Sequence, residues 1–181
     1  MKNNLVFSHF LPQKILQFVL AGILLFGFTA CFYVEDPSEP IYETEYSPVY
    51  ISRQDLNNSV KFENARPLKE TGKIFMKGSY VFVGERYEGV HVIDNRNPKS
   101  PENVGFIAIA GNVDVSTKGN ILYADNAVDL VAIDISNLPA IKVVKRVEEI
   151  FSEANQVLPP DGGSFDYDSD KGYIIDWIKN E

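Results

Sequence analysis

Apolar residues follow two different patterns along this chain. Residues 15–28 form one continuous apolar run without a charge, and three small or polar residues, Thr29-Ala30-Cys31, follow it. From residue 49 onward the apolar residues come in short runs, many of them β-branched or aromatic, separated by Gly, Asn, Asp and Pro. Such short runs between turn residues are typical of β-strands. We therefore expect an N-terminal membrane-directed segment and an all-β domain over residues 49–181.

The strand pattern occurs twice at a spacing of about forty residues. The segment Lys77–Val83, a Lys-Gly pair followed by a strand-forming run, returns 41 residues later as Lys118–Ala124. A second apolar run that ends in aspartate, Val90–Asp94, returns 40 residues later as Leu130-Val131-Ala132-Ile133-Asp134. Glycine accepts the backbone of a tight turn, and the aspartate that ends the second run favours a loop. Each copy therefore predicts a meander of four short antiparallel strands.

Four strands in about forty residues is the length of one β-propeller blade. We predict blades over residues 72–111 and 112–150. A partial third copy is expected over residues 165–181, where Lys171-Gly172 again precedes an apolar run. The fold predicted is all-β, with propeller-like repeats of four short antiparallel strands. The alternative is an ordinary β-meander or sandwich in which two hairpins are similar by chance.

The second copy resembles a known repeat. The segment Leu130–Ser136 is similar to the LVIVD repeat of bacterial and archaeal surface proteins, whose motif reads Leu-Val-Ile-Val-Asp-Ile-Ser, and Val90–Asp94 is a degenerate copy that ends in Asp94. The stretch Val49–Ile150 resembles the N-terminal part of lipoproteins of this family. The resemblance implies a β-propeller and a place on the cell surface. It implies no biochemical role, because the family's role is generally unassigned.

The N-terminal segment predicts export. Lys2 and Lys14 precede the apolar run, as in a secretory signal peptide. Phe28-Thr29-Ala30-Cys31 resembles the lipobox of bacterial lipoproteins, which implies removal of residues 1–30 and lipidation of Cys31. The alternative is an uncleaved anchor, because residues 15–34 lack charge and are long enough to span a membrane. In both cases the lysines stay inside and residues 35–181 are outside.

The segment of residues 31–48 is expected to be an acidic tether. It carries five acids and three prolines with little apolar periodicity, and such a composition keeps a chain extended and hydrated. Acids soon after a lipidated cysteine resemble a surface-export signal of some Gram-negative lipoproteins, although a plain spacer explains the same residues and is the preferred interpretation. We predict a lipid-anchored protein of the bacterial cell envelope, in the outer membrane and exposed at the surface.

The charge balance excludes one class of partner. Removal of residues 1–30 takes away two lysines and no acid, so the net charge falls from −8 to −10. A chain this acidic is repelled by phosphate backbones, and nucleic acid is not an expected partner. The expected partners are the membrane, through the lipid anchor, and a protein or a glycan. With its one cysteine acylated, the domain contains no disulfide and depends on its apolar core.

One acidic loop is a candidate metal site. Asp166, Asp168 and Asp170 occupy alternate positions, as ligands do in calcium loops. Lys171 stands where an EF-hand has glycine, and Trp177 stands where it has glutamate. The alternative is a solvated turn between two strands. No other cofactor is expected.

The remaining candidates for catalysis are few. His91 is predicted to be a structural residue of a strand, because no catalytic motif surrounds it. Asp94 and Asp134 could in principle form the carboxylate pair of a glycan hydrolase. Their simpler role is to form the turn that follows each strand.

We therefore expect a non-enzymatic binding or scaffold module. The alternatives are an extracellular carboxylate-dependent hydrolase that acts on glycans, and a truncated repeat protein without independent function. An incomplete third repeat would leave an apolar C-terminal edge strand, and we expect self-association through it. The apolar residues of that edge are Ile174, Ile175, Trp177 and Ile178.

Overall fold

The computed structural model describes residues 42–152 and 157–181. The chain divides into two units, residues 1–40 and 41–181, and the described residues all belong to the second. The signal peptide, Cys31 and most of the expected tether lie outside the described residues, so these assignments stay predictions. In the part of the chain that is described, no helix is long and apolar enough to cross a membrane.

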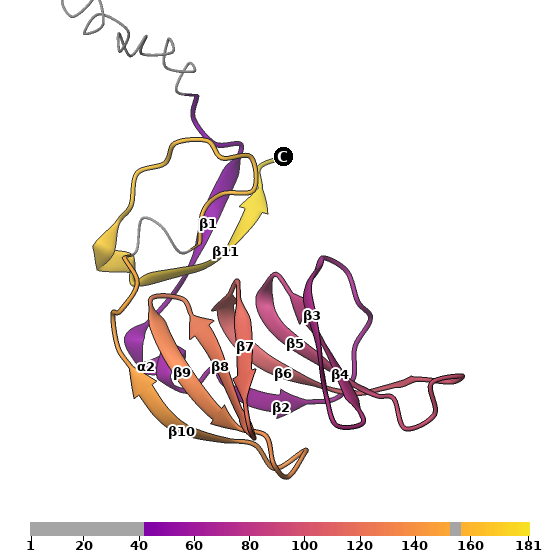
Figure 1. Ribbon diagram of the computed structural model, residues 1–181. Helices are drawn as coiled ribbons and strands as arrows, with labels where there is room; N and C mark the ends of the chain where they lie inside the picture. Colours follow the sequence, from indigo (N-terminus) through magenta and orange to yellow (C-terminus); the bar gives the residue numbers. More distant parts are fainter. Residues whose placement is uncertain (1–41, 153–156) are drawn as a thin grey trace, which may run out of the picture. The chain divides into compact units, whose positions relative to one another are not determined.

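The described residues form an almost entirely β structure, as predicted (Figure 1). The elements in chain order are β1 (Tyr46–Ile51), α2 (Arg53–Asn57), β2 (Lys61–Glu63), β3 (Thr71–Lys77), β4 (Tyr80–Glu85), β5 (Tyr87–Asp94), β6 (Glu102–Asn112), β7 (Val115–Lys118), β8 (Ile121–Asn126), β9 (Asp129–Asp134), β10 (Lys142–Val147), the 3₁₀ helix η1 (Ser169–Lys171) and β11 (Tyr173–Lys179).

The two predicted repeats are two separate antiparallel meanders. Strands β3 to β6 follow one another in one sheet, and β2 joins its edge beside β6. Strands β7 to β10 follow one another in a second sheet of four strands. Two-residue turns at Gly78-Ser79 and Gly119-Asn120, each directly after a lysine, connect the first and second strands of the two meanders. The prediction of propeller-like repeats of four short strands is confirmed.

The main core lies where the two meanders pack face to face. Side chains alternate across a strand, so one face of each sheet supplies every second residue. The first sheet contributes Phe82, Val90, Val92 and Ile107, and the second contributes Leu122, Ala124, Val131 and Ile133. Each of these residues is at most 1% exposed. Full burial of one such side chain stabilises a fold by about 1.5–3 kcal/mol, so this interface holds the two repeats together.

The opposite face of the first sheet is covered by a connecting segment. We call residues 64–70, which lead from β2 to β3, the strap. The guanidinium of Arg66 lies 3.4 Å from the centroid of the Phe106 ring, and Asn103 Nδ2 donates a 2.8 Å hydrogen bond to the Arg66 carbonyl. His91 and Phe106 are fully buried as a result. The strap therefore covers this face over β5 and β6, whereas Ile74 and Met76 on β3 of the same face are 63% and 64% exposed.

The predicted third repeat is not a repeat. An apolar strand does follow Lys171-Gly172, but β11 pairs with β1, antiparallel, rather than with a preceding strand. The tether prediction is also wrong at its end, because β1 begins at Tyr46 within the stretch expected to be a spacer. Pairing with β1 satisfies backbone groups along one edge of β11, which local sequence patterns do not reveal.

The C-terminal strand is less exposed than expected. Ile174 and Trp177 are 5% and 6% exposed, and they pack with Tyr87 and Val157 in a second, smaller core. The indole Nε1 of Trp177 donates a 3.0 Å hydrogen bond to the Val157 carbonyl. Of the four apolar residues named for the edge, Ile178 is the one that stays strongly exposed. The prediction of an open apolar edge is therefore largely wrong. Self-association through β11 stays a prediction, but an exposed apolar edge no longer supports it.

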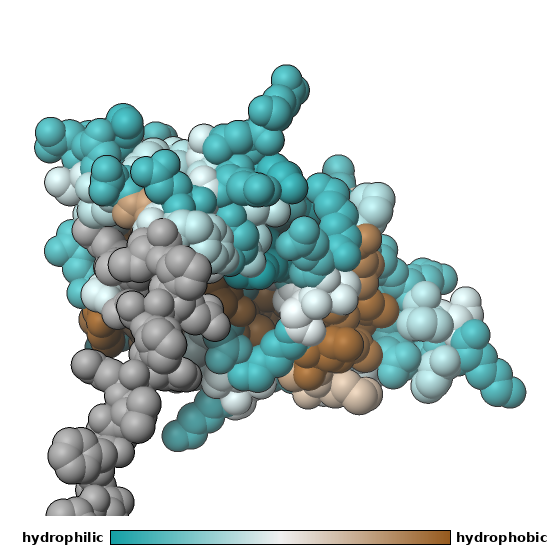
Figure 2. Space-filling model, turned by 90° about the horizontal axis from the view of Figure 1, so that it is seen from above, coloured by the Kyte–Doolittle hydropathy of each residue, from teal (hydrophilic) through white to brown (hydrophobic). Residues whose placement is uncertain are grey.

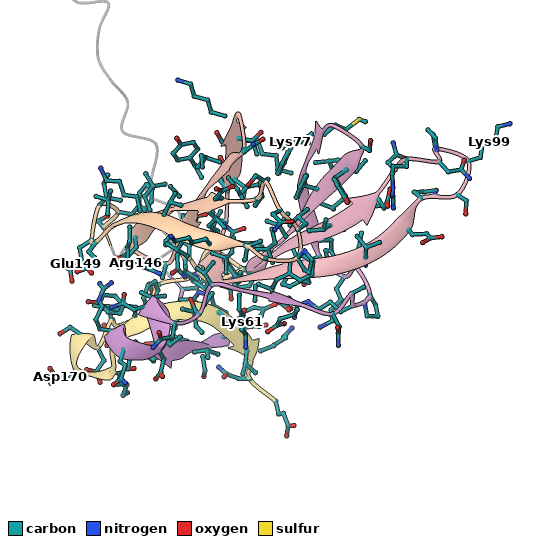
Figure 3. The ribbon with its side chains drawn as sticks, turned by 90° about the horizontal axis from the view of Figure 1, so that it is seen from below. Lys61, Lys77, Lys99, Arg146, Glu149 and Asp170 are labelled. Carbon is teal, nitrogen blue, oxygen red and sulfur yellow. The ribbon has the colours of Figure 1, made fainter. Side chains whose placement is uncertain are left out.

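A buried carboxylate joins the short helix to the second sheet. Ser52 caps α2, and Leu56 is its fully buried residue. Asp129, at the start of β9, accepts hydrogen bonds from Arg53 at 2.7 Å and from Arg146 at 2.5 Å. Figure 3 shows Arg146 and Glu149 at the same end of the molecule, and the Glu149 amide donates to the same carboxylate at 3.0 Å. Two cations and an amide thus compensate the burial of this charge.

Gly172 offers a direct test of how β11 docks on β1. Its φ is +101°, and a Cβ there would lie 2.3 Å from the Ile51 carbonyl oxygen. Gly119 also has positive φ, at +60°, but open space surrounds it. We expect Gly119→Ala to lower the free energy of unfolding by ~1–2 kcal/mol, because alanine is strained in the left-handed conformation. Gly172→Ala should lower it by more than ~3 kcal/mol, because a steric clash is added to that strain. Urea unfolding of both variants measures the two costs, and equal costs would contradict the docking described.

Candidate functional site

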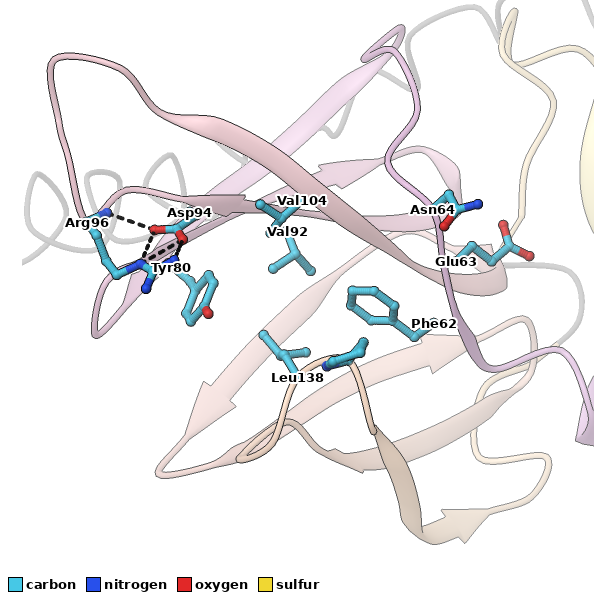
Figure 4. A pocket seen from close by; sticks show the side chains of 10 residues that line it. Phe62, Glu63, Asn64, Tyr80, Val92, Asp94, Arg96, Val104 and Leu138 are labelled. Carbon is cyan, nitrogen blue, oxygen red and sulfur yellow. Dashed lines mark hydrogen bonds and ion pairs between the residues drawn. The ribbon is translucent and has the colours of Figure 1, made fainter.

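A cleft with a volume of about 940 Å³ lies between the two repeats (Figure 4). Three parts of the chain line it. The first sheet and its β5–β6 loop form one wall, β2 and the residue after it form a second, and the β9–β10 loop forms the third. The lining residues are Phe62, Glu63, Asn64, Tyr80, Val92, Asp94, Arg96, Val104, Leu138 and Pro139.

The middle of the cleft is apolar. Figure 4 shows the side chains of Phe62 and Leu138 facing each other from opposite sides, with Val92 and Val104 beside them. Phe62 and Leu138 are partly buried and pack against the core between the sheets. An apolar centre bounded by a few polar groups is the usual composition of a ligand site.

The polar groups at one end of the cleft neutralise each other. Asp94 Oδ2 accepts a 2.8 Å hydrogen bond from Arg96 Nε, and Asp94 Oδ1 accepts one of 2.9 Å from the Arg96 amide. These hydrogen bonds, from the Arg96 side chain first, hold the pKa of Asp94 below its usual range. The same contacts close the turn after β5, so the turn-forming role predicted for Asp94 is what the structure shows.

Asp134 closes the matching turn of the second repeat. Its Oδ1 accepts a 2.9 Å hydrogen bond from the Ser136 amide, and this contact lowers the pKa of Asp134. Asp134 is absent from the lining of the cleft that contains Asp94. A glycan hydrolase needs one carboxylic acid whose pKa is raised so that it can donate a proton. Both aspartates have lowered pKa values, so the pair does not match that requirement.

The expected calcium loop does not form a metal site. The described residues hold no group of three His, Cys, Asp or Glu side chains arranged to bind a metal ion, so Asp166, Asp168 and Asp170 do not converge. Asp168 instead caps η1 by accepting from the Asp170 amide at 3.2 Å, and it pairs with Lys171 Nζ at 3.2 Å. The geometry therefore does not support the calcium prediction, because Asp168 is used in the turn itself and Lys171 competes for it.

His91 is a buried partner of a carboxylate that the sequence did not reveal. Its Nε2 lies 2.8 Å from Glu85 Oε2, and its ring stands edge-on to Phe106 at 4.8 Å between centroids. A proton on Nε2 makes the histidine the donor, and Nδ1 then faces Asn103 Nδ2 at 3.5 Å. The side chain of His91 is fully buried, so it cannot reach a solute, in keeping with the structural role predicted for it.

Glu85 is the residue that fixes the strap. Its carboxylate accepts hydrogen bonds from the Lys69 amide at 3.1 Å, from the Glu70 amide and from His91. Burial acts to raise the pKa of Glu85, but the hydrogen bonds from Lys69, His91 and Glu70 outweigh it, and the pKa is lowered. Glu85 and Asp129 were both missed from the sequence. An acid at the end of a strongly apolar strand was the available signal for Glu85.

Comparison with known proteins identifies the repeats. A family model described as the LVIVD repeat matches residues 70–108 and again residues 110–148. The chain therefore carries two LVIVD repeats, one for each meander, within a few residues of the boundaries predicted. No curated protein and no solved structure gives a significant match to the chain.

Replacement of Glu85 should make the fold less sensitive to acid. The pKa of Glu85 is lowered in the folded chain, so its ionised form stabilises the fold above the unfolded-state pKa, and this stabilisation is lost as the pH falls through the folded pKa. We expect Glu85→Gln to lower the free energy of unfolding by about 1–3 kcal/mol at pH 7. Below about pH 4.5 the free energy of unfolding should fall less steeply with pH in the variant than in the wild type. Urea unfolding between pH 7 and pH 3.5 measures both effects. Glu148→Gln, at an exposed position, is the control that should leave the curve unchanged.

Proposed function

We propose that this protein of two LVIVD repeats is an exported, lipid-anchored surface protein that acts as a non-enzymatic binding or scaffold module. LVIVD repeats are not typically enzymatic. The repeat architecture supports the general class, a repeat-type binding or scaffold module. Export and anchoring rest on the N-terminal sequence.

The observation that carries the binding function is the cleft between the repeats. Its centre is apolar, and its one arginine is held by Asp94 through 2.8 Å and 3.0 Å hydrogen bonds from Nε. Groups that neutralise each other in this way orient a ligand well but are poor proton donors or nucleophiles. The cleft therefore suits a partner that places an apolar or aromatic group between Phe62 and Leu138.

The proposed partner is a protein or a glycan. The polar residues at the edge of the cleft favour a partner that has polar groups around an apolar centre. Asn64 offers both a donor and an acceptor, and Glu63 offers an acceptor at the same end of the cleft. Glu63 is already paired with Lys61 Nζ at 2.9 Å, so the rim adds little net charge. Recognition would then depend on shape and hydrogen bonding more than on charge.

The hydrolase alternative is not favoured by any contact in the cleft. Its acid would have to be Asp94 or Glu63, and each carboxylate is paired with a cation. Self-association and truncation without function are also less well supported, because β11 pairs with β1 and Trp177 is buried. A scaffold or binding role needs neither a catalytic carboxylate nor an open edge strand.

The cleft can be filled without disturbing the core. Val104 lines the cleft and is 43% exposed, whereas Ile74 is exposed on the first sheet and lines no cleft described above. We expect a glycan and peptide array to give at least one ligand, and Val104→Trp to weaken its binding at least tenfold, because the indole occupies the space between Phe62 and Leu138. Ile74→Trp is the matched control and should bind as the wild type does. Equal losses in both variants would argue against the cleft.

The anchor is tested separately. Full-length protein made in a Gram-negative host and fed a labelled fatty acid should carry the label and sediment with membranes. Cys31→Ala should carry no label, because the thiol that accepts the lipid is gone. Ser38→Ala, in the expected tether, serves as the control and should stay labelled. Label that persists in Cys31→Ala would contradict lipidation at this residue.

A further inference from the structure

The cleft between the repeats has polar groups at both ends and an apolar centre. Figure 4 shows Tyr80 and Arg96 at one end, Asn64 and Glu63 at the other, and Phe62 and Leu138 between them. Exposed apolar side chains alone do not select a ligand, and Figure 2 shows hydrophobic residues at the surface among hydrophilic ones. A ligand that fills the cleft must present polar groups at both of its ends and an apolar surface between them.

Two of the polar groups are neutral and available to a ligand. The hydroxyl of Tyr80 and the side-chain amide of Asn64 line the cleft, and neither makes a hydrogen bond to a described residue. Each of these groups can both donate and accept a hydrogen bond. A carboxylate only accepts and an ammonium only donates, whereas the hydroxyl group of a sugar does both. The two side chains therefore match hydroxyl groups better than they match an ion.

Arg96 adds donors without adding net charge. A guanidinium has five N–H groups, and in Arg96 those of Nε and Nη2 bond Asp94, which leaves the Nη1 edge for a ligand. The Asp94 carboxylate neutralises the guanidinium, and Glu102 lies near enough to act on the same charge. An acidic ligand therefore gains little attraction here, whereas a hydroxyl oxygen can still accept from Arg96.

The centre of the cleft suits the C–H face of a sugar ring. The face of an aromatic ring is negative and attracts the weakly positive hydrogens of such C–H groups. Phe62 is fixed in place because its ring touches the backbone of Gly105, where a Cβ would lie 2.1 Å from Phe62 Cζ. The ring of Tyr80 lies 6.4 Å from that of Phe82 in the core. Both rings are held before a ligand arrives, which lowers the entropy cost of binding.

A peptide finds fewer of the contacts that it needs. Extended peptides bind to sheets by adding a strand at an open edge, through backbone hydrogen bonds. Strands β4, β5 and β6, which line the cleft, each have a neighbouring strand on both sides. Strand β2 lies at an edge but has only the three residues Lys61–Glu63. An acidic or phosphorylated motif would need unpaired cations, and Arg96 is paired with Asp94.

We propose that the cleft binds a neutral oligosaccharide, with one sugar ring between Phe62 and Leu138 and hydroxyl groups of its neighbours on Tyr80 and Asn64. The volume of about 940 Å³ lies in the upper part of the range of about 300–1,000 Å³ for ligand sites, so more than one sugar ring is needed to reach both polar ends. The assignment rests on the proposed binding function. It narrows the partner from a protein or a glycan to a glycan without net charge.

Binding to an array tests the class of ligand. The array carries neutral oligosaccharides of glucose, mannose, galactose and xylose, acidic oligosaccharides of galacturonic acid, and a random peptide library. The full chain is made in its membrane-anchored form and purified in detergent. We expect at least one neutral oligosaccharide to bind, and to bind more tightly than its monosaccharide does. The affinity should stay the same from low salt to about 0.5 M, because no unpaired charge takes part.

Two mild substitutions locate the contact. Tyr80→Phe keeps the ring and removes only the hydroxyl, and Asn64→Ala removes an exposed amide. Each should weaken binding of the neutral oligosaccharide by about three- to tenfold, the range expected for one hydrogen bond. Tyr123→Phe makes the same change on the second sheet, outside the lining of the cleft, and should bind as the wild type does. Wild-type affinity in either cleft variant, or an equal loss in Tyr123→Phe, would overturn the assignment.

The same array separates this assignment from the binding function on which it rests. Val104→Trp fills the cleft against a ligand of any class. If peptides or acidic glycans bind the wild type but not Val104→Trp, and no neutral glycan does, the assignment is overturned and the binding function stands. If every ligand on the array binds Val104→Trp as it binds the wild type, or none binds either protein, both proposals fail.

Discussion

The rest of this structure depends on the packing of one repeat against the other. A meander of four strands has two faces, and one face of each meander is lined with apolar side chains that a single repeat could not remove from water. The core of Phe82, Val92, Leu122 and Ile133 removes one face of each from solvent. What remains is a face at each end of the stack. On the first sheet the strap covers part of that face, over β5 and β6.

Two buried carboxylates attach the segments that surround the repeats. Glu85 binds the strap through backbone amides, and Asp129 binds α2 and the end of β10 through two arginines and the Glu149 amide. Hydrogen bonds to a charged acceptor are stronger than neutral ones, and loss of a partner inside a fold is costly. The pKa of each carboxyl is lowered although burial opposes it. Both attachments are therefore expected to weaken together in acid.

The cleft exists because the two repeats meet only along their apolar faces. At the ends of β5 and β9 the chain turns away through Asp94 and Asp134, and the space between the loops is closed at the bottom by Phe62 and Leu138. Asp94 thus shapes one end of the cleft through its turn, whereas Asp134 closes the matching turn outside the lining of the cleft. The cleft therefore belongs to the junction of the two repeats.

Local signals in the sequence are sufficient to predict the two repeats. The period of forty residues, the Lys-Gly turns and the run that ends in Asp94 or Asp134 are local signals, because turn chemistry and side-chain alternation act over a few residues. They predicted two four-stranded meanders and the role of both aspartates. The pairing of β11 with β1, the contact of Glu85 with His91 and the failure of Asp166, Asp168 and Asp170 to converge become visible only in the folded chain. Those contacts join residues through space, and their free energy depends on burial and partners that no local pattern records.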